Sequence, residues 1–479
     1  MAAQKKTFSA NTIISIDQSA IVVKTLAPKG WVTENTAFLI IHGIGNQNPL
    51  ETLDSFGRGF IHAYADELGC PISAFVVTHE VAVKPDLVGG VWFDNFVRIS
   101  KSGEEAHIDL YEYYWANQTQ DKASLHQIQV WVSDVVRQAK KFYEENVTME
   151  ANAADRKFAK KSSEKDPLTN QSKVKFQGFR YKFFLLLVAL ALPLFNLFLK
   201  SPRWIAKKNI PVISWIADLV AGWWDETISA QFANVVGDIV VYNTSDAKSS
   251  LYEIRKNILA GAVASVRYLI EAPKNESGPP YSRVILAGHS LGTQIAYDAI
   301  NRINHLINFE AIAGIRKDGV LLDASGKPNS ENKQISSILC GLVTFGSPLD
   351  KIAFFLREHI HRENSIMLQI INDYHSFRQR DWYNISNGRD LDIKVEKTIA
   401  RLFEDIPWRN YFDKRDYVSG SLDFYDGVLN IDCNYSSNPI KKMRNGVLKT
   451  YTSGRFSFTH SWYWDNEAMF KDIIENFLR

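Results

Sequence analysis

The stretch at residues 282–293 most constrains how this chain can fold, because an apolar run there ends abruptly in a glycine-flanked serine. Residues 284–287 read Val-Ile-Leu-Ala, residues 288–292 read Gly-His-Ser-Leu-Gly, and residues 293–303 have the pattern of a helix. A strand that turns directly into a helix holds the residue at the turn in strained geometry and pushes its side chain into the open. The glycines on either side let the strand and the helix pack closely. The pattern therefore makes Ser290 a candidate nucleophile.

The composition restricts the class of protein. The chain has 479 residues, which is more than one typical domain, and its 46% hydrophobic residues are ample for a large core. A formal charge of +2 is too balanced to indicate a nucleic-acid-binding protein. The cysteines Cys70, Cys340 and Cys433 are widely spaced, which fits a reducing compartment without a disulfide framework. No apolar core of a secretory signal follows Met1, so we expect no classical signal peptide.

Short apolar segments alternate with helix-like segments along the chain. This alternation predicts an α/β fold with a central, mainly parallel sheet. In such a sheet, sites form beyond the carboxyl ends of the strands, where Ser290 would lie. Besides 284–287, we predict strands at 37–41, 74–82, 90–115, 339–345, 408–412 and 447–452, a hairpin or edge strands within 1–36, helices at 51–68, 250–270 and 467–478, and mostly helix over 352–405.

A long insertion divides the predicted domain. We expect residues 1–115 and 232–479 to form its N-terminal and C-terminal parts, and a polar plus hydrophobic helical insertion to occupy 116–231. Within that insertion, residues 140–177 are polar and lysine-rich, which is typical of a solvated segment.

The apolar part of the insertion, residues 183–224, predicts contact with a membrane. Its first run, 183–199, has the lower limit of length for a spanning helix, and its second run carries Asp218 and ends in two tryptophans. The strands on either side must share one sheet, so the number of crossings must be even. Three interpretations stay open: a helical hairpin that dips into one leaflet, a cap buried against the rest of the domain, or true spanning helices. We expect a protein on the cytoplasmic side that is associated with the membrane.

A serine nucleophile requires a base that removes its proton, because a free hydroxyl is too weak an acid at neutral pH. His460 follows the last predicted strand and precedes the last predicted helix, where a loop can bring it over Ser290. It is therefore the candidate base. The other histidines after Ser290 lie in segments that we interpret as helices, where a surface role is expected: His305, His359, His361 and His375.

An acidic residue must orient that base, and on a strand-turn-helix site of this kind the chain order is serine, then acid, then histidine. Asp416 follows a predicted strand and precedes His460, so it is the first candidate, with Asp413 second and Asp423 and Asp426 as further rivals. A carboxylate there would fix the imidazole tautomer and stabilise the imidazolium.

The developing oxyanion requires hydrogen-bond donors. The backbone N–H of Leu291, at the start of the helix after Ser290, is one candidate. The second is the N–H of Ile44, in the glycine-containing loop that follows the strand at 37–41.

Taken together, five motifs resemble the α/β-hydrolase superfamily, and they are most similar to its lipase-like bacterial members. They are His42-Gly-Ile-Gly45, Gly288-His-Ser-Leu-Gly292, Phe345-Gly-Ser-Pro348, Asp416-Tyr-Val-Ser-Gly420 and His460. The resemblance covers about residues 35–115 and 232–479. It implies a catalytic triad of Ser290, Asp416 and His460, lipid or other carboxylic esters as substrates, and no metal or organic cofactor.

The sequence therefore predicts a serine hydrolase that cleaves a lipid or amphiphilic ester through an acyl-serine intermediate. Two alternatives stay open. The same triad would also serve a thioesterase or an acyltransferase, and a membrane-attached scaffold without turnover could retain the fold.

Overall fold

The described part of the chain is built around a nine-stranded sheet, and we analysed it in a computed structural model. Its strand order is β1-β11-β10-β9-β8-β2-β5-β4-β3. Neighbours from β1 to β5 are parallel, whereas β4 and β3 add an antiparallel hairpin at one edge. The structure describes residues 13–15, 30–43, 48–82, 93–119, 159–165, 172–176, 242–243, 250–271, 280–350, 352, 399–413, 416, 418–422, 425–433, 441–444, 447–450 and 459–478.

The strands of this sheet are short, and their bounds are β1 (Ile13–Ser15), β2 (Thr36–Ile41), β3 (Phe75–Val81), β4 (Asn95–Lys101), β5 (His107–Tyr113), β8 (Arg283–His289), β9 (Leu339–Phe345), β10 (Trp408–Phe412) and β11 (Val428–Asp432). The helices and 3-10 turns that accompany them are α1 (Glu51–Leu68), η1 (Ile72–Ala74), α2 (Ala116–Thr119), α8 (Ser250–Ile270), α9 (Gly292–Asn308), α10 (Ile335–Ile338), η4 (Thr459–Asp465) and α13 (Glu467–Phe477).

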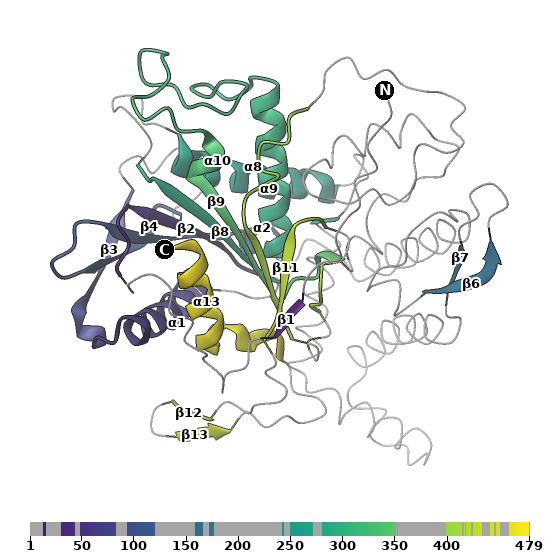
Figure 1. The fold of residues 1–479 in the computed structure, drawn as a ribbon, viewed down its shortest axis with the longest axis horizontal. Helices are drawn as coiled ribbons and strands as arrows, with labels where there is room; N and C mark the ends of the chain where they lie inside the picture. The colour runs from purple at the N-terminus through teal and green to yellow at the C-terminus, as the bar shows by residue number, and fades with distance from the viewer. Residues whose placement is uncertain are drawn as a thin grey trace.

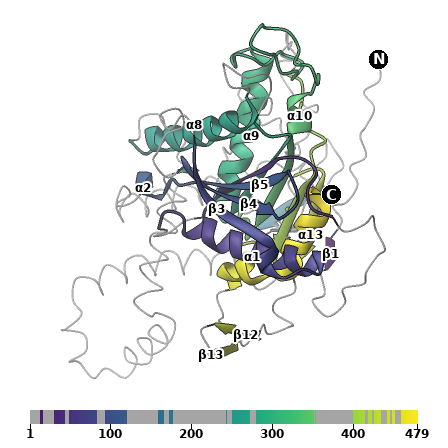
Figure 2. The ribbon, with the colours of Figure 1, turned by 90° about the vertical axis from the view of Figure 1, so that its left-hand side faces the viewer.

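Helices cover both faces of the sheet. In Figures 1 and 2, α8, α9 and α10 lie on one face, and α1 and α13 lie on the other. The strands accordingly have apolar side chains on both faces, as expected for parallel strands buried on both sides. In β2, Leu39 and Ile41 join the core under α8 and α9, whereas Phe38 and Ile40 join the core under α1 and α13.

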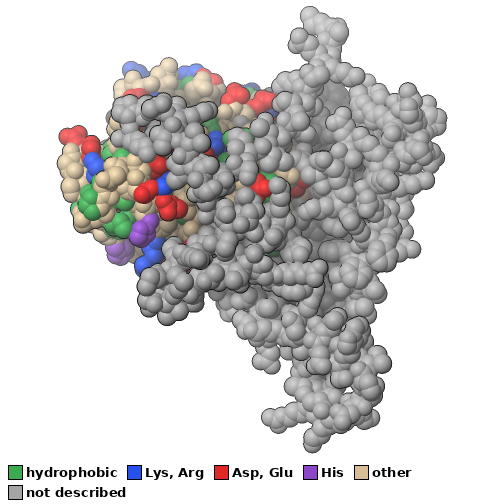
Figure 3. Space-filling model, turned by 60° about the horizontal axis from the view of Figure 1, so that its bottom comes forward, with side chains coloured by type: hydrophobic (Ala, Val, Ile, Leu, Met, Phe, Trp, Pro, Cys, Tyr) green, Lys and Arg blue, Asp and Glu red, His purple; other side chains and the backbone are tan. Residues whose placement is uncertain are grey.

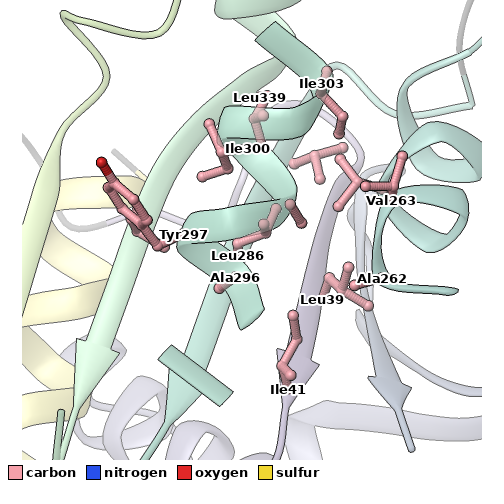
Figure 4. Close-up of a cluster of buried hydrophobic side chains, with 14 of the residues drawn as sticks. Leu39, Ile41, Ala262, Val263, Leu286, Ala296, Tyr297, Ile300, Ile303 and Leu339 are labelled. Carbon is pink, nitrogen blue, oxygen red and sulfur yellow. The ribbon is translucent and has the colours of Figure 1, made fainter. Parts of the chain in front are cut away.

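The core between α9 and the sheet shows why this helix lies where it does. Ala296, Ile300 and Ile303 recur at helical spacing and pack against Leu286 of β8 and Leu39 of β2 (Figure 4). All five side chains are buried. Because α9 directly follows β8, this packing also holds the turn that joins the two elements.

The prediction of an α/β fold with a mainly parallel sheet is confirmed, and the predicted helices at 51–68 and 250–270 are α1 and α8. The segment predicted as one strand region, 90–115, contains two strands, β4 and β5, separated by a turn. Strand β11 was not predicted. Asn430 and Asp432 interrupt its apolar pattern, and both are buried in the fold.

Two predicted elements differ from the structure. The strand expected at 447–452 is β13 (Val447–Thr450), which pairs with β12 (Lys441–Arg444) in a separate antiparallel hairpin. The insertion that we expected to be helical contains an antiparallel strand pair, β6 (Ala159–Lys165) and β7 (Ser172–Phe176). Both strands consist mostly of polar residues, and a hairpin can form through its backbone hydrogen bonds without an apolar stripe. The spacing of apolar residues therefore gave no signal from which these strands could be predicted.

Several predictions concern residues that the structure does not describe. The apolar segment at 183–224 lies outside the described residues, so its predicted contact with a membrane is not tested. Most of 352–405 also lies outside them, so the helices predicted there are not tested either. Among the helices that are described, none is both long and apolar enough to cross a membrane. On the described part of the face shown in Figure 3, acidic, basic and hydrophobic side chains are interspersed, in keeping with the near-neutral formal charge.

Candidate active site

Ser290 lies at the turn between β8 and α9. Its backbone has φ of +52°, in the left-handed region that residues other than glycine rarely adopt. Such a conformation costs on the order of 1–3 kcal/mol and persists only where the surrounding structure enforces it. The Ser290 N–H donates a hydrogen bond to the carbonyl oxygen of Phe345 at the end of β9, with an N···O distance of 3.1 Å. The strained turn is therefore fastened to the neighbouring strand.

The two glycines of the turn are required by close packing. A methyl group on Gly288 would lie 2.7 Å from the Cα of Thr293, and one on Gly292 would overlap the carbonyl oxygens of Ile41 and His42. The first contact joins β8 to its own helix, and the second joins the helix to the end of β2. The expectation that a small residue allows the strand and its own helix to pack closely is confirmed at Gly288, whereas Gly292 is required by the close approach of β2.

The Ser290 side chain is buried, contrary to the expectation that the turn exposes it. It has 0% exposed surface, and its hydroxyl oxygen has no hydrogen-bond partner among the described residues. A methyl group on Gly43 would come within 2.7 Å of the Ser290 Cβ. The loop after β2 therefore packs against the serine. A buried hydroxyl without a partner is destabilising by about 1–3 kcal/mol and is typical of functional sites.

Asp416 and His460, which lie 44 positions apart in the chain, meet in the structure. The Nδ1 atom of His460 is 2.8 Å from Oδ2 of Asp416, and both side chains are buried. Because a carboxylate only accepts, Nδ1 carries the proton of this bond, which leaves Nε2 as the nitrogen that can take a further proton. Burial alone would raise the pKa of Asp416, but the adjacent His460 and the hydrogen bonds to its oxygens hold that pKa well below its ordinary value. Asp416 is therefore charged and oriented toward the imidazole.

Tyr463 organises the surroundings of this carboxylate. Its hydroxyl donates to Oδ2 of Asp416 at 2.9 Å and accepts from the backbone N–H of Asp413 at 3.1 Å. It also lies 3.0 Å from the hydroxyl of Ser419, while the Val418 N–H donates to the other Asp416 oxygen. One buried phenol from η4 thus joins the end of β10 to the loop at 413–422, which we call the acid loop.

A row of buried amides fastens the acid loop to the sheet. Asn410 of β10 donates to the carbonyl oxygen of Gly420 and to the side-chain oxygen of Asn430, both at 2.9 Å. The same Asn430 oxygen accepts from the N–H of Leu422 at 2.9 Å. Asn430, one of the two polar residues that obscured β11 in the sequence, therefore helps to hold the loop that carries Asp416.

The ends of β8 and β9 place the ring of His460 beside the neighbours of Ser290, although the Ser290 hydroxyl makes no hydrogen bond with it. A methyl group on Gly346, the residue after the strand that binds the Ser290 N–H, would lie 3.0 Å from Cε1 of His460. On the other side, the ring of His289 lies 4.9 Å from the ring of His460, measured between centroids. His460 therefore packs against the residues that flank Ser290 in the chain and in the sheet.

Of the rival acids and bases, the structure describes Asp413, Asp426 and His305. Asp413 is buried at the end of β10, yet the carboxylate that bonds to His460 Nδ1 is that of Asp416, and Asp426 belongs to the turn before β11. Asp423 lies outside the described residues, and so do His359, His361 and His375. His305 was expected on the surface, but it is buried in α9, where it stacks with Phe309. It was misjudged because α9 is covered by the segment at 399–402 as well as by the sheet.

The predicted oxyanion donors are only partly described. Leu291 is the residue that precedes the first turn of α9, and no side chain caps this helix end. Its backbone N–H thus belongs to the group that a helix leaves without an internal partner. Ile44 lies outside the described residues, although Gly43 before it packs on Ser290.

His42, at the start of the loop after β2, is held in one tautomer by hydrogen bonds. Its Nε2 accepts a hydrogen bond from the backbone N–H of Trp115 at 3.0 Å, so the remaining proton is on Nδ1, which lies 2.6 Å from the Gly43 carbonyl oxygen. The Trp115 indole stacks on the imidazole and donates to the His42 carbonyl oxygen. Burial lowers the pKa of His42 to about 4, so the ring stays neutral at physiological pH.

Among the described residues, no group of histidines, cysteines or carboxylates is arranged to hold a metal ion. Comparison of the chain with protein-family models, curated proteins and solved structures finds no match. Function must therefore be inferred from the residues of the site. Sequence reasoning missed Tyr463, Asn410, Asn430 and Trp115, because their role depends on which distant segments they contact. Ser419 could have been found from the sequence, because it belongs to the motif that begins at Asp416.

Proposed function

We propose that this chain is a serine hydrolase of the α/β-hydrolase type, with Ser290 as nucleophile, His460 as base and Asp416 as orienting acid. The observation that carries the proposal is the 2.8 Å contact between His460 Nδ1 and Asp416, made against the residues that flank a strained, buried serine. The order serine, aspartate, histidine along the chain agrees with this type of site.

The position of the serine in the sheet supports the same reading. After β2 the chain crosses to the edge strand β3 and returns through β4 to β5, which pairs with β2. It then enters β8 on the other side of β2 and builds outward through β9, β10 and β11. The helices that follow β2 and β8, α1 and α9, cover opposite faces of the sheet. Ligands of open α/β sheets bind beyond the carboxyl ends of the strands at such a switch point. Gly43 and Ser290 follow the two strands that meet there, β2 and β8.

The proposed reaction uses each residue in one role. The Ser290 oxygen attacks the ester carbonyl carbon while Nε2 of His460 takes the hydroxyl proton, and Asp416 stabilises the resulting imidazolium. The C–O bond to the alcohol then breaks, and His460 returns the proton to the leaving oxygen. Water then attacks the acyl carbon while His460 takes its proton, the bond from that carbon to the Ser290 oxygen breaks, and His460 returns the proton to Ser290, which releases the acid. Backbone N–H groups of Leu291 and of the loop after Gly43 would stabilise the oxyanion.

The proposed substrates are lipid or other amphiphilic carboxylic esters. The support for this class is the apolar sequence at 183–224, together with the resemblance of the motifs to lipase-like hydrolases. The same segment supports association with a membrane. A chain lacking residues 178–226 that still fractionates between membrane and cytosol as the full chain does would remove that part of the proposal.

The direct test is the hydrolysis of p-nitrophenyl esters of graded chain length by the full chain and by Ser290→Ala. We expect turnover by the parent and its loss in the variant, by on the order of 10⁴-fold or more, because the covalent route is removed. Labelling of the parent by a fluorophosphonate, with the adduct found on Ser290, gives a readout independent of the substrate. Equal rates for variant and parent would overturn the proposal.

A further inference from the structure

His289 is a second buried histidine that the proposed triad does not use. It occupies the last position of β8, directly before Ser290, and its ring packs against Phe345, Trp464 and His460 at centroid distances of 5.4, 5.0 and 4.9 Å. Burial, with a further contribution from nearby His460, lowers its pKa to about 3. The ring is therefore neutral at physiological pH. An apolar side chain would fill this aromatic environment without the desolvation of two nitrogens.

One of these nitrogens has a defined partner. Nε2 of His289 lies 3.1 Å from the backbone carbonyl oxygen of His460. A carbonyl only accepts hydrogen bonds, so Nε2 carries the proton and Nδ1 is bare. The bare Nδ1 is buried, has no hydrogen-bond partner among the described residues, and faces Gly43 at 3.1 Å from where a methyl group on that glycine would lie.

We infer that His289 is a positioning residue that holds the base, His460, in register with the nucleophile beside it. This inference rests on the proposed function. The side chain of His460 is oriented by Asp416, but that bond fixes one end of the ring only. The bond from His289 to the His460 carbonyl fixes the backbone from which the ring extends, and it does so from the residue adjacent to Ser290 in the chain.

The consequence is a direct link between nucleophile and base. A displacement of the strained turn would carry His289, and with it the His460 backbone, in the same direction. A neutral imidazole also suits this place better than a cation would. During the proposed reaction His460 becomes positively charged, and a second charge 4.9 Å away would oppose that step.

The test compares His289→Gln with His289→Met in the full chain. The two new side chains have similar length, but only that of Gln has a hydrogen-bond donor. Gln can place an amide N–H near the position of Nε2, whereas Met cannot donate. We expect Met to slow fluorophosphonate labelling of Ser290 about tenfold and to move the acid limb of the pH–rate profile to lower pH, because His460 is held less firmly against Asp416. We expect Gln to restore most of the rate and the profile.

A residue that merely fills space would leave the pH profile unchanged and would make Gln, the polar variant, the worse of the two. Either result would overturn the inference, as would an unchanged labelling rate in His289→Met. If the parent itself fails to label, the proposed function fails instead, so the two failures are distinguishable. If a variant does not fold, the tautomer of His289 in the parent provides a second measurement, and histidine-selective ¹⁵N spectra report it. They must show the tautomer protonated at Nε2 of His289, and the opposite tautomer would contradict the inference.

Discussion

The two sides of the candidate site are held in different ways. The nucleophile side, formed by the turn at 288–292, is fixed by backbone contacts so close that a methyl group on either glycine would clash. The acid side, formed by Asp416 and the acid loop, is fixed by buried hydrogen bonds from Tyr463 and Asn410. The first depends on close backbone packing against two adjacent strands, β2 and β9, whereas the second depends on hydrogen-bonding side chains that come from η4 and β10. The comparison indicates that geometry at the serine is set by shape, and geometry at the acid by polar partners.

The acid side should show the largest effect on activity. Asp416→Asn removes the negative charge and favours the wrong tautomer of His460, so we expect the rate of Ser290 acylation to fall on the order of 10⁴-fold. Asp413→Asn is the matched control three residues away, and we expect its rate to stay within about tenfold of the parent. Single-turnover labelling of both variants checks this. A larger loss in the Asp413 variant would reassign the acid.

The nucleophile side should show the largest effect on stability. In Gly292→Ala the new methyl group would overlap the carbonyl oxygens of Ile41 and His42, so β2 must move, and we expect a loss of about 3–5 kcal/mol or a failure to fold. The control is Gly314→Ala, whose methyl group meets nothing within 4 Å but whose φ is +84°. Conformational strain alone should cost that variant about 1–2 kcal/mol in urea unfolding. Gly292 is not among the glycines with positive φ, so a loss in Gly292→Ala no larger than that in Gly314→Ala would contradict the overlap as the reason for this glycine.

Two buried groups on neighbouring strands, His42 after β2 and Glu112 in β5, predict opposite responses to acid. Burial lowers the pKa of His42 from 6.5 to about 4, so between these values the unfolded chain binds more protons than the folded one. Stability from this group is complete above pH 6.5 and is lost as the pH falls toward 4, by roughly 2–3 kcal/mol. His42→Gln, which retains an acceptor for the Trp115 N–H, should lose less stability over this range in denaturant titrations.

Glu112 provides the opposite control. Its burial raises its pKa from 4.5 to about 7, so the folded chain binds the extra proton and gains stability as the pH falls through 7 toward 4.5. Glu112→Gln should therefore make the acid-induced loss steeper than in the parent. If neither variant changes the slope, the two groups titrate alike in the folded and unfolded chains.

The smallest effect concerns a single hydroxyl of the acid side. Tyr463→Phe removes the donor to Asp416 and the acceptor for the Asp413 N–H, and we expect acylation about tenfold slower with a loss of about 1–2 kcal/mol. Tyr113→Phe is the control, because its buried hydroxyl donates to the Ile258 carbonyl oxygen away from the acid loop. It should lose similar stability and keep the rate of the parent. Equal rates of Ser290 acylation in Tyr463→Phe and Tyr113→Phe would contradict the conclusion that polar partners set the geometry of the acid side.

What could be predicted from the sequence follows the same division. The turn at Ser290 was readable because its requirements are local: an apolar strand, two glycines and an amphipathic helix in consecutive positions. The helices α1 and α8 were readable for the same reason. Asp416 and His460 could be nominated by their order in the chain, but Asp413 remained an open rival, because sequence distance does not say which carboxylate a histidine reaches.

The tertiary structure alone decided the remainder. Strand β11 was hidden because Asn430 looks polar in the sequence, and its burial is offset only in the fold, where Leu422 and Asn410 donate hydrogen bonds to its side-chain oxygen. The burial of Ser290 also depends on distant residues, because the loop after β2 closes on it. By itself, the sequence determined the fold class and the local geometry of the serine, which follow from periodicity and steric size. The pairing of Asp416 with His460, and the ring of His289 behind it, required the contacts that only folding creates.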